Sequence, residues 1–209
     1  MKNLELQKCI LGPVYTNCYF LKNKTTGEMI VIDPADFPEK IYEKVIQMGG
    51  KPAAILLTHG HFDHIMAAQA VKEKYNIPIY ACRQEEEMLR EPSVNMTAHY
   101  GKNCSIIPDV LLNDLEVFQV AGFTIQIIHT PGHTPGGCCY YMEQEGVLFS
   151  GDTLFQTSVG RSDFPGGSAS ALVRSVKEKL LVLPEETHVY PGHMEETTIG
   201  YEKLHNPFI

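Results

Sequence analysis

The segment Thr58–His64, with the sequence THGHFDH, constrains this chain more than any other feature of its 209 residues. It directly follows Ala53–Leu57, a short apolar run typical of a strand buried on both faces. Ligand clusters at the ends of such strands are where α/β proteins form their sites. A solvated loop rich in histidine is the alternative, but three histidines and an aspartate at a strand end disfavour it. We therefore interpret the segment as a ligand cluster.

The spacing inside this segment divides its ligands into two pairs. In extended backbone, residues two apart point the same way, so His59 and His61 can bind one ion together. Helical spacing begins at Ile65, and the turn into that helix redirects Asp63 and His64 toward a neighbouring point. Four ligands in two pairs are typical of two adjacent metal ions.

Three later residues supply the further ligands that two metal ions need: His133, Asp152 and His193. Each lies at or just after a predicted strand and close to a glycine, which allows close backbone approach. Prolines fix the loops of the two histidines. A lone histidine after a strand is more often structural, so each signal is weak by itself. Together with Thr58–His64, however, these residues complete two coordination spheres.

The rest of the chain alternates helices with runs of strands in both halves. We expect helices at Pro38–Met48, Ile65–Tyr75, Glu85–Arg90 and Ser168–Leu183, the last with Ser168 as its N-cap. The segment Gly151–Gly167 is expected to be a long loop. Strands are predicted at Leu4–Leu11, Asn17–Leu21, Met29–Ile32, Ala53–Leu57, Ile77–Ala81, Leu115–Val120, Phe123–Ile128, Gly137–Met142, Val147–Phe149 and His188–Tyr190. This order indicates an α/β protein with two sheets packed face to face and helices outside.

Length and charge narrow the class of protein. A chain of 209 residues favours one domain over residues 1–209. Its 17 basic and 25 acidic residues give a net charge of −8, which argues against a nucleic-acid or membrane-surface partner. The N-terminus lacks the apolar core of a signal peptide, and no apolar stretch is long enough to span a membrane. We expect a cytoplasmic protein whose six cysteines are free thiols.

The ordered ligand set resembles that of the metallo-β-lactamase-fold hydrolase superfamily, and within it the glyoxalase II-like (hydroxyacylglutathione hydrolase-like) branch, over nearly the whole chain. The resemblance implies a four-layer αββα sandwich of two mixed β-sheets, with the site at one edge. It implies that Asp33 orders the ligand loop without binding metal and that Asp152 bridges two ions. The implied ligands are His59, His61 and His133 for the first ion, and Asp63, His64 and His193 for the second.

The resemblance also implies a reaction. Imidazole and carboxylate ligands suit two zinc ions, and also iron or manganese. Two such ions can share a water whose pKa falls to about 7, giving a metal-bound hydroxide that attacks a carbonyl. Asp63 is the candidate catalytic residue that accepts the proton of this water. Candidate substrate contacts are Arg161, Phe164 and Tyr15, although an ion pair of Arg161 with Asp163 that braces the loop is an equal alternative.

Hydrolysis of a small-molecule thioester, an S-acyl thiol conjugate, is the favoured activity. Longer glyoxalase II enzymes carry an added helical domain, whereas 16 residues follow His193 here, so residues 83–105 are the candidate pocket wall. The alternative is a persulfide dioxygenase of the same fold with one iron on His59, His133 and Asp152. The β-lactamases fit less well, because they typically carry cysteine where Asp152 stands. Neither a nucleic acid nor a membrane is an expected partner.

Overall fold

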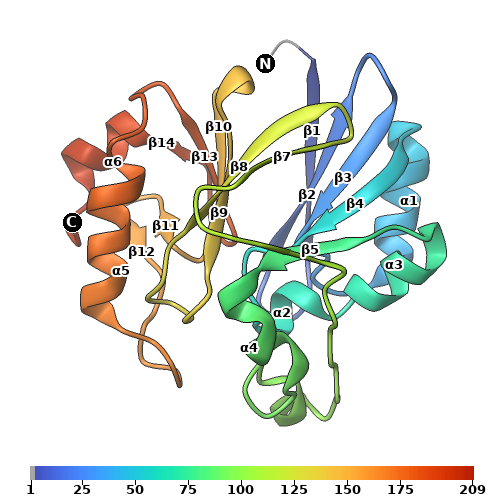
Figure 1. Ribbon diagram of the computed structural model, residues 1–209, viewed down its shortest axis with the longest axis horizontal. Coiled ribbons are helices and arrows are strands. Elements are labelled where there is room, and N and C mark those ends of the chain that lie inside the picture. Colours follow the sequence, from blue (N-terminus) through green and yellow to red (C-terminus); the bar gives the residue numbers. More distant parts are fainter. Residues whose placement is uncertain (1–2) are drawn as a thin grey trace.

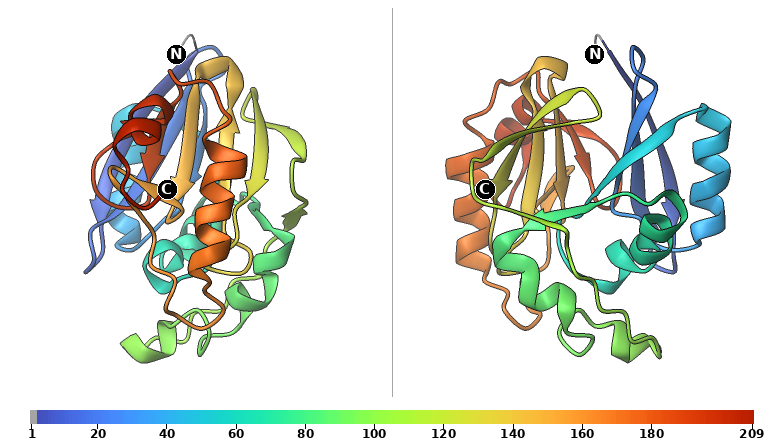
Figure 2. Two further views of the ribbon diagram at one scale, coloured as in Figure 1. Left: turned by 90° about the vertical axis from the view of Figure 1, so that its left-hand side faces the viewer. Right: turned by 45° about the vertical axis from the view of Figure 1, so that its right-hand side comes forward.

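Two six-stranded sheets pack face to face in the computed structural model, which describes residues 3–209 (Figure 1). The first sheet has the order β1-β2-β3-β4-β5-β6 and the second has the order β14-β13-β10-β9-β8-β7. Helices cover the outer face of each sheet, as the two views of Figure 2 show. The structure therefore confirms the predicted αββα sandwich.

Each sheet mixes parallel and antiparallel pairs. In the first sheet β1 to β3 are antiparallel and β3 to β6 are parallel. In the second sheet β10 and β13 are parallel and the other pairs are antiparallel. The strands of the first sheet are β1 (Leu4–Leu11), β2 (Thr16–Asn23), β3 (Glu28–Ile32), β4 (Lys51–Leu56), β5 (Ile79–Cys82) and β6 (Val110–Leu112). Those of the second are β7 (Val117–Val120), β8 (Phe123–His129), β9 (Cys138–Met142), β10 (Val147–Gly151), β13 (His188–Pro191) and β14 (Thr197–Thr198).

The helices divide into outer layers and a group near one edge of the sheets. The first outer layer is α1 (Pro38–Met48) and α3 (Ala68–Tyr75), and the second is α5 (Ala169–Ser175), the π-helical η4 (Val176–Leu180) and α6 (Ile199–His205). At the bottom of Figure 1 lie α2 (Phe62–Ile65) and α4 (Glu86–Arg90), beyond the strand ends. Short 3-10 turns are η1 (Arg83–Glu85), η2 (Thr97–Tyr100) and η3 (Glu143–Glu145), and a small hairpin is formed by β11 (Leu154–Phe155) and β12 (Ser158–Val159).

Strand β2 shows why the sheets stack in this way. Its side chains alternate between two apolar clusters, as successive side chains on a strand must. Cys18 and Phe20 pack with Val45 and other residues under α1 and α3, whereas Tyr19 and Leu21 pack between the sheets. A third cluster joins the second sheet to η4 and α6. Because the strands are apolar on both faces, each sheet needs a covering layer on each side.

Four local predictions need correction. The predicted helix Ile65–Tyr75 is two helices, since helix α2 already begins at Phe62 and the Ala67 N–H leaves the helical pattern to donate to the Pro34 carbonyl oxygen at 3.0 Å. The predicted loop Gly151–Gly167 contains the β11–β12 hairpin.

Strands β6 and β14 are not predicted from the sequence, because they have only three and two residues, too few for a periodic pattern. The fourth helix changes to π-helical geometry after Ser175. Its predicted cap is confirmed, because Ser168 Oγ accepts the N–H of Ala171 at 3.3 Å.

Two further expectations concern the chain as a whole. Within the described residues no helix has the length and apolar character that crossing a bilayer requires. All six cysteines are free thiols, and four of them are buried. Residues 1–2, part of the N-terminus considered above, lie outside the described residues. The single domain and the cytoplasmic location remain predictions.

Candidate metal centre

The ends of five strands bring the predicted ligands and Asp33 to one edge of the sandwich, and β8 of the second sheet is the strand that precedes His133. Strands β3 and β4 are parallel, so Asp33 and the segment Thr58–His64 follow them at the same edge of the first sheet. Strands β10 and β13 are also parallel, and they place Asp152 and His193 at the same edge of the second sheet. The site therefore forms where the two sheets face each other, and each sheet contributes ligands.

Three imidazoles meet at the first point of this site. His133 Nε2 lies 2.8 Å from His61 Nδ1 and 3.2 Å from His59 Nε2, and all three side chains are buried. Their ring nitrogens lie within 4.8 Å of one another, which is the spacing of a group that can hold a metal ion. The structure thus brings together the three residues predicted for the first ion.

A second point is formed by a carboxylate and two imidazoles. Asp63 Oδ2 lies 3.1 Å from His193 Nε2 and 3.5 Å from His64 Nε2. These three side chains form another group that can hold a metal ion. Asp63 and His64 are presented by the first turn of α2, one turn earlier than expected, while His193 comes from the loop after β13. The three residues predicted for the second ion are also together.

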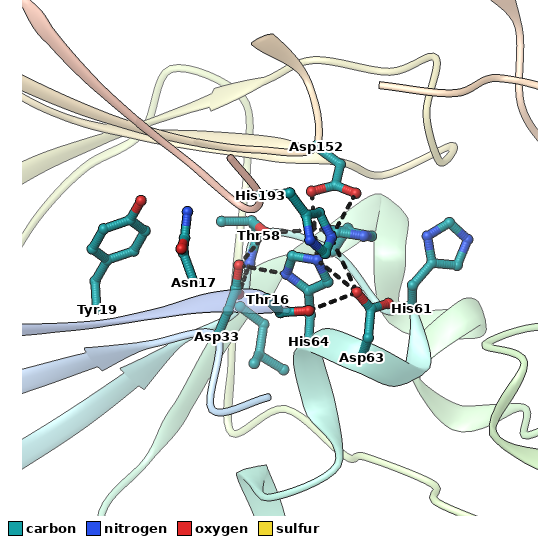
Figure 3. A network of polar contacts seen from close by, with 12 residues as sticks. Thr16, Asn17, Tyr19, Asp33, Thr58, His61, Asp63, His64, Asp152 and His193 are labelled. Carbon is teal, nitrogen blue, oxygen red and sulfur yellow. Dashed lines mark hydrogen bonds and ion pairs between the residues drawn. The ribbon is translucent and has the colours of Figure 1, made fainter. Parts of the chain in front are cut away.

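Asp152 lies between the two points. Its Oδ2 is 3.5 Å from His133 Nε2 of the first point and 3.5 Å from His193 Nε2 of the second, and its Oδ1 is 3.5 Å from His64 Nε2. In Figure 3 the dashed lines from Asp152 reach His193 and His64 from above, opposite Asp63. The Asp152 carboxylate is therefore within reach of both points.

Hydrogen bonds behind the ligands fix which imidazole nitrogen carries a lone pair. His133 Nδ1 donates to the carbonyl oxygen of Arg161 at 2.7 Å, which leaves Nε2 without a proton. His59 Nδ1 lies 3.1 Å from Thr58 Oγ1, and that hydroxyl donates to Asp33, so it accepts from His59 and leaves Nε2 of His59 unprotonated. When both rings are neutral, the Nε2 atoms of His133 and His59 are therefore both acceptors that repel each other across 3.2 Å, while His61 Nδ1 can donate to His133 Nε2 at 2.8 Å. A cation bound by both removes this repulsion.

Two buried atoms at the second point also lack a partner. Among the described residues, His64 Nε2 and Asp152 Oδ1 form no hydrogen bond, although they lie 3.5 Å apart and are shielded from water. Leaving a buried polar atom unpaired costs about 1–3 kcal/mol, so such atoms need an explanation. A divalent cation satisfies both. The chemistry of the donors, imidazole and carboxylate, fits zinc, iron or manganese.

The pKa shifts keep His59, His61 and Asp152 deprotonated, whereas the raised pKa values of His64 and His193 favour the protonated ring. Burial lowers the pKa of His61 to about 3 and holds that of His59 well below its usual value. Burial alone would raise the pKa of Asp152, but His64 and the other histidines outweigh burial and hold it far below its usual range. For His64, burial lowers the pKa, yet Asp63 and the other carboxylates raise it well above normal. In the metal-free protein His64 therefore holds a proton that a cation would replace.

Several supporting residues were not recognised in the sequence. Thr16 Oγ1 donates to Asp63 Oδ2 at 2.8 Å (Figure 3). Asn17 Nδ2 donates to the carbonyl oxygens of Pro191 and Met194, on either side of His193. Glu85 accepts backbone N–H groups beside the first point. A polar residue at the start of an apolar strand was the available signal for Thr16 and Asn17. Asp33 was expected to order the ligand loop, and it accepts from Thr58 and lies 2.9 Å from His64 Nδ1.

The predicted substrate contacts have different surroundings. The Phe164 ring lies 5.5 Å from the His61 ring, and the Arg161 guanidinium stacks on Phe164 at 3.8 Å, so this pair borders the first point. Arg161 also forms an exposed ion pair with Asp163 at 2.7 Å. The Tyr15 side chain is 74 % exposed and directly precedes Thr16. The roles of Arg161, Phe164 and Tyr15 toward a substrate remain predictions.

An αββα sandwich with a histidine and aspartate cluster where its two sheets meet defines a metal-binding protein of the metallo-hydrolase class. The Metallo-beta-lactamase superfamily profile matches residues 11–193. This chain belongs to the metallo-beta-lactamase superfamily.

Two relatives from bacteria match most of the chain. "Probable metallo-hydrolase YqgX" of Bacillus subtilis is 38% identical over 208 residues, covering 99% of this chain and 98% of that protein. "Hydroxyacylglutathione hydrolase GloC" of Haemophilus influenzae is 35% identical over 182 residues, covering 86% of each protein. This similarity places the chain among metallo-hydrolases.

Three solved structures share the fold closely. BLEG-1 B3 metallo-beta-lactamase superimposes with a TM-score of 0.92 at 41% identity, covering 98% of this chain and 99% of that one. TTHA1623 in a di-iron-bound form has a TM-score of 0.84 at 37% identity, covering 97% and 100%. ETHE1 from Myxococcus xanthus has a TM-score of 0.79 at 27% identity, covering 97% and 83%. The fold is therefore compatible with more than one chemistry.

Proposed function

We propose that this chain is a binuclear metal-dependent hydrolase that cleaves S-acyl thiol conjugates, which are thioesters. The observation that carries the proposal is the position of Asp152, whose carboxylate lies 3.5 Å from imidazole nitrogens of both points. In this proposal Asp152 bridges the two ions. His59, His61 and His133 hold the first ion, and Asp63, His64 and His193 hold the second.

The residues of the site have separate tasks in thioester hydrolysis. When bound, the ions supply Lewis acidity and lower the pKa of a coordinated water to about 7. Asp63 accepts a proton from the attacking water. Its contacts to Thr16 and His193 use Oδ2, which leaves Oδ1 available, and its two histidine neighbours overcome burial to keep its pKa below the usual value. Asp63 is therefore ionised near neutral pH, the state in which it can accept a proton, and its lowered pKa makes it a weaker base than a free aspartate.

The loop that follows Asp152 supplies the contacts proposed for the substrate. Phe164 offers an apolar surface next to His61, and the Arg161 guanidinium stacks on the Phe164 ring. We assign these two side chains, with Tyr15 on the opposite loop, to the acyl group and its thiol carrier. The similarity to hydroxyacylglutathione hydrolase GloC supports a small-molecule thioester as the substrate class.

The experiment that tests the proposal measures free thiol released from S-lactoylglutathione and a panel of other acyl thiols. The protein is loaded with zinc, iron or manganese, and metal per chain is quantified in each preparation. The metal-stripped protein is the control and is expected to be inactive. Turnover of at least one thioester with about two ions per chain supports the proposal. No thioester turnover across the panel with any metal removes it.

The alternative activity is that of a persulfide dioxygenase with a single iron. It is favoured by one observation, that His59, His133 and Asp152 lie together, with His133 Nε2 3.2 Å from His59 Nε2 and 3.5 Å from Asp152 Oδ2. The structural similarity to ETHE1 is compatible with it. Oxygen uptake with glutathione persulfide, at one iron per chain and without thioester turnover, would establish this alternative.

The similarity to BLEG-1 B3 metallo-beta-lactamase makes β-lactams a third substrate class for the same assay. The sequence fits the β-lactamases less well, because Asp152 stands where they typically carry cysteine. β-Lactam hydrolysis without thioester hydrolysis would replace the proposed substrate class but keep the metal centre.

A further inference from the structure

A buried carboxylate outside the ligand set joins the two loops of the first point. The Glu85 side chain belongs to a residue that is 1 % exposed, at the junction of η1 and α4. Its Oε1 accepts the backbone N–H of Gly60 at 2.8 Å, and its Oε2 accepts the backbone N–H of Gly136 at 2.7 Å. Both carboxylate oxygens are therefore used, each on a different loop.

The two glycines hold key places in those loops. Gly60 lies between His59 and His61, on the loop after β4 of the first sheet. Gly136 lies three residues after His133, on the loop between β8 and β9 of the second sheet. One side chain thus ties together the loops that carry all three imidazoles of the first point.

The glycines also explain how this side chain reaches both loops. A Cβ atom on Gly60 would lie 2.9 Å from Met88 Cγ and 3.3 Å from the backbone nitrogen of Leu89. A Cβ atom on Gly136 would overlap the backbone of Gln84 and Glu85. The segment from η1 to α4 therefore packs directly on the backbone of both loops.

Glu85 forms no ion pair among the described residues, whereas its neighbour Glu86 pairs with Arg90 of α4 at 2.7 Å. Burying a charge without a cation is costly, so a neutral side chain would serve a purely structural contact better. A carboxylate has one advantage here, because both its oxygens accept hydrogen bonds and two backbone donors must be satisfied at once.

The second point is held by other residues. Asp63 is contacted by Thr16, His64 by Asp33, and the loop of His193 by Asn17. None of these three contacts involves Glu85. A change at Glu85 therefore acts on the spacing of the first three imidazoles and leaves the other ligands as they are.

We propose that Glu85 is a positioning residue that sets the distance between the His59–His61 pair and His133, and thereby sets the affinity of the first metal position without touching the ion. This inference rests on the metal centre of the proposed function, but not on thioester chemistry. Outer hydrogen bonds of this kind typically change metal affinity by about 10- to 100-fold.

The test is Glu85→Gln, measured as zinc affinity at each position by competition with a chelator. Glutamine offers one acceptor oxygen and turns an NH2 donor toward the second backbone N–H. We expect the affinity of the first position to fall by about 10- to 100-fold and that of the second to stay within about 3-fold. His61→Ala and His193→Ala identify which binding step belongs to which position. The visible spectrum of bound Co²⁺ gives an independent readout of the first position.

The matched control is Glu86→Gln, which changes the next, partly exposed glutamate at the start of α4 and is expected to bind zinc like the unmodified protein. If Glu85→Gln does not fold, Glu85→Asp is the second variant, because its carboxylate is too short to reach both loops. We expect it to lose zinc affinity at the first position and to keep that of the second. Unchanged affinity at the first position, or an equal loss at both positions, overturns the inference. An unmodified protein that binds two ions but cleaves no thioester would overturn the proposed function alone.

Discussion

Asp33 Oδ2 lies 2.9 Å from His64 Nδ1, and this contact links the end of β3 to a ligand on α2. The same carboxylate accepts the backbone N–H of Thr58 at 2.8 Å and its hydroxyl at 2.6 Å. One buried side chain therefore orients the helix that carries Asp63 and His64 and the loop that carries His59. Asp33 itself has a φ of 48°, a left-handed backbone conformation that aspartate adopts more readily than most residues.

Replacing Asp33 with asparagine is expected to weaken metal binding. The amide cannot accept all three hydrogen bonds, so one donor from Thr58 or His64 is left unpaired in a buried place. We expect zinc affinity to fall by about 10- to 100-fold, measured by chelator competition. Asp36→Asn is the control, because Asp36 contacts Phe37 and Lys102 rather than a ligand. Equal affinities for the two variants would contradict the role of Asp33.

Asp152→Ala is expected to remove turnover and reduce the metal content. Two dications without a carboxylate between them repel each other, so they cannot both bind tightly. We expect a loss of about a thousandfold or more in kcat/KM and fewer than two ions per chain, measured by elemental analysis. Asp114→Ala, at a surface ion pair with Lys179, is the matched control. Full metal content with full turnover in Asp152→Ala would show that Asp152 does not bridge the ions.

Thr16 offers a test of the proton acceptor. Thr16→Val keeps the shape of the side chain but removes the hydroxyl that donates to Asp63 at 2.8 Å. We expect kcat to fall by about 10-fold, because Asp63 loses the contact that orients it. Thr16→Ser restores the hydroxyl and is expected to stay within about 3-fold of the unmodified protein. The hydroxyl has no such role if the valine and serine variants have the same kcat.

The raised pKa of the Glu85 carboxyl group predicts that the stability of the metal-free protein depends on pH. Burial raises its pKa to about 7 from 4.5, despite the hydrogen bonds from Gly60 and Gly136. Between these two pKa values the folded protein holds a proton that the unfolded chain releases. The free energy of unfolding of the metal-free protein therefore falls as pH rises through this window, by on the order of 3 kcal/mol from this group. Urea denaturation at several pH values compares it with Glu85→Gln, which lacks this titration. A difference between the two that does not vary with pH rules out the shift.

Arg161→Ala separates substrate binding from loop bracing. The ion pair with Asp163 is exposed, and exposed pairs contribute little to stability. We expect Tm and metal content to stay unchanged, and KM for the thioester to rise several-fold because the cover of Phe164 is lost. Asp163→Ala removes the ion pair but keeps the arginine, so its KM is expected to change less. A lower Tm with an unchanged KM would assign Arg161 to bracing.

Elements with strong local signals could be predicted from the sequence. Helix α1 has the expected bounds, since Pro38 suits its first turn and Gly49, with a φ of 59°, ends it. The convergence of the candidate ligands could also be predicted, because their spacing on strand ends encodes which side chains can meet, whereas metal binding by them stays a prediction. The seven residues do converge, and their grouping into two points with Asp152 between them matches the expected geometry.

Features that depend on distant contacts could not be predicted. Glu85 is one of three consecutive glutamates, and only the packing of η1 against Gly60 and Gly136 distinguishes it from Glu86 and Glu87. Strand β14 has two residues, and its pairing with β13 rather than its own composition makes it a strand. The early start of α2 depends on the same kind of contact, because the Phe62 N–H donates to the Asn95 carbonyl oxygen.

Because ligands come from both sheets, release of an ion is linked to separation of the two halves. Any opening that separates the β4 loop from the ligand loops of the second sheet, which carry His133 and His193, dismantles both coordination points together. Metal binding should therefore suppress hydrogen exchange across the whole sandwich, and the amides of both halves should share one slow opening rate. Bound cations would then couple the unfolding of the two sheets, so that both halves of the molecule unfold as a single cooperative unit.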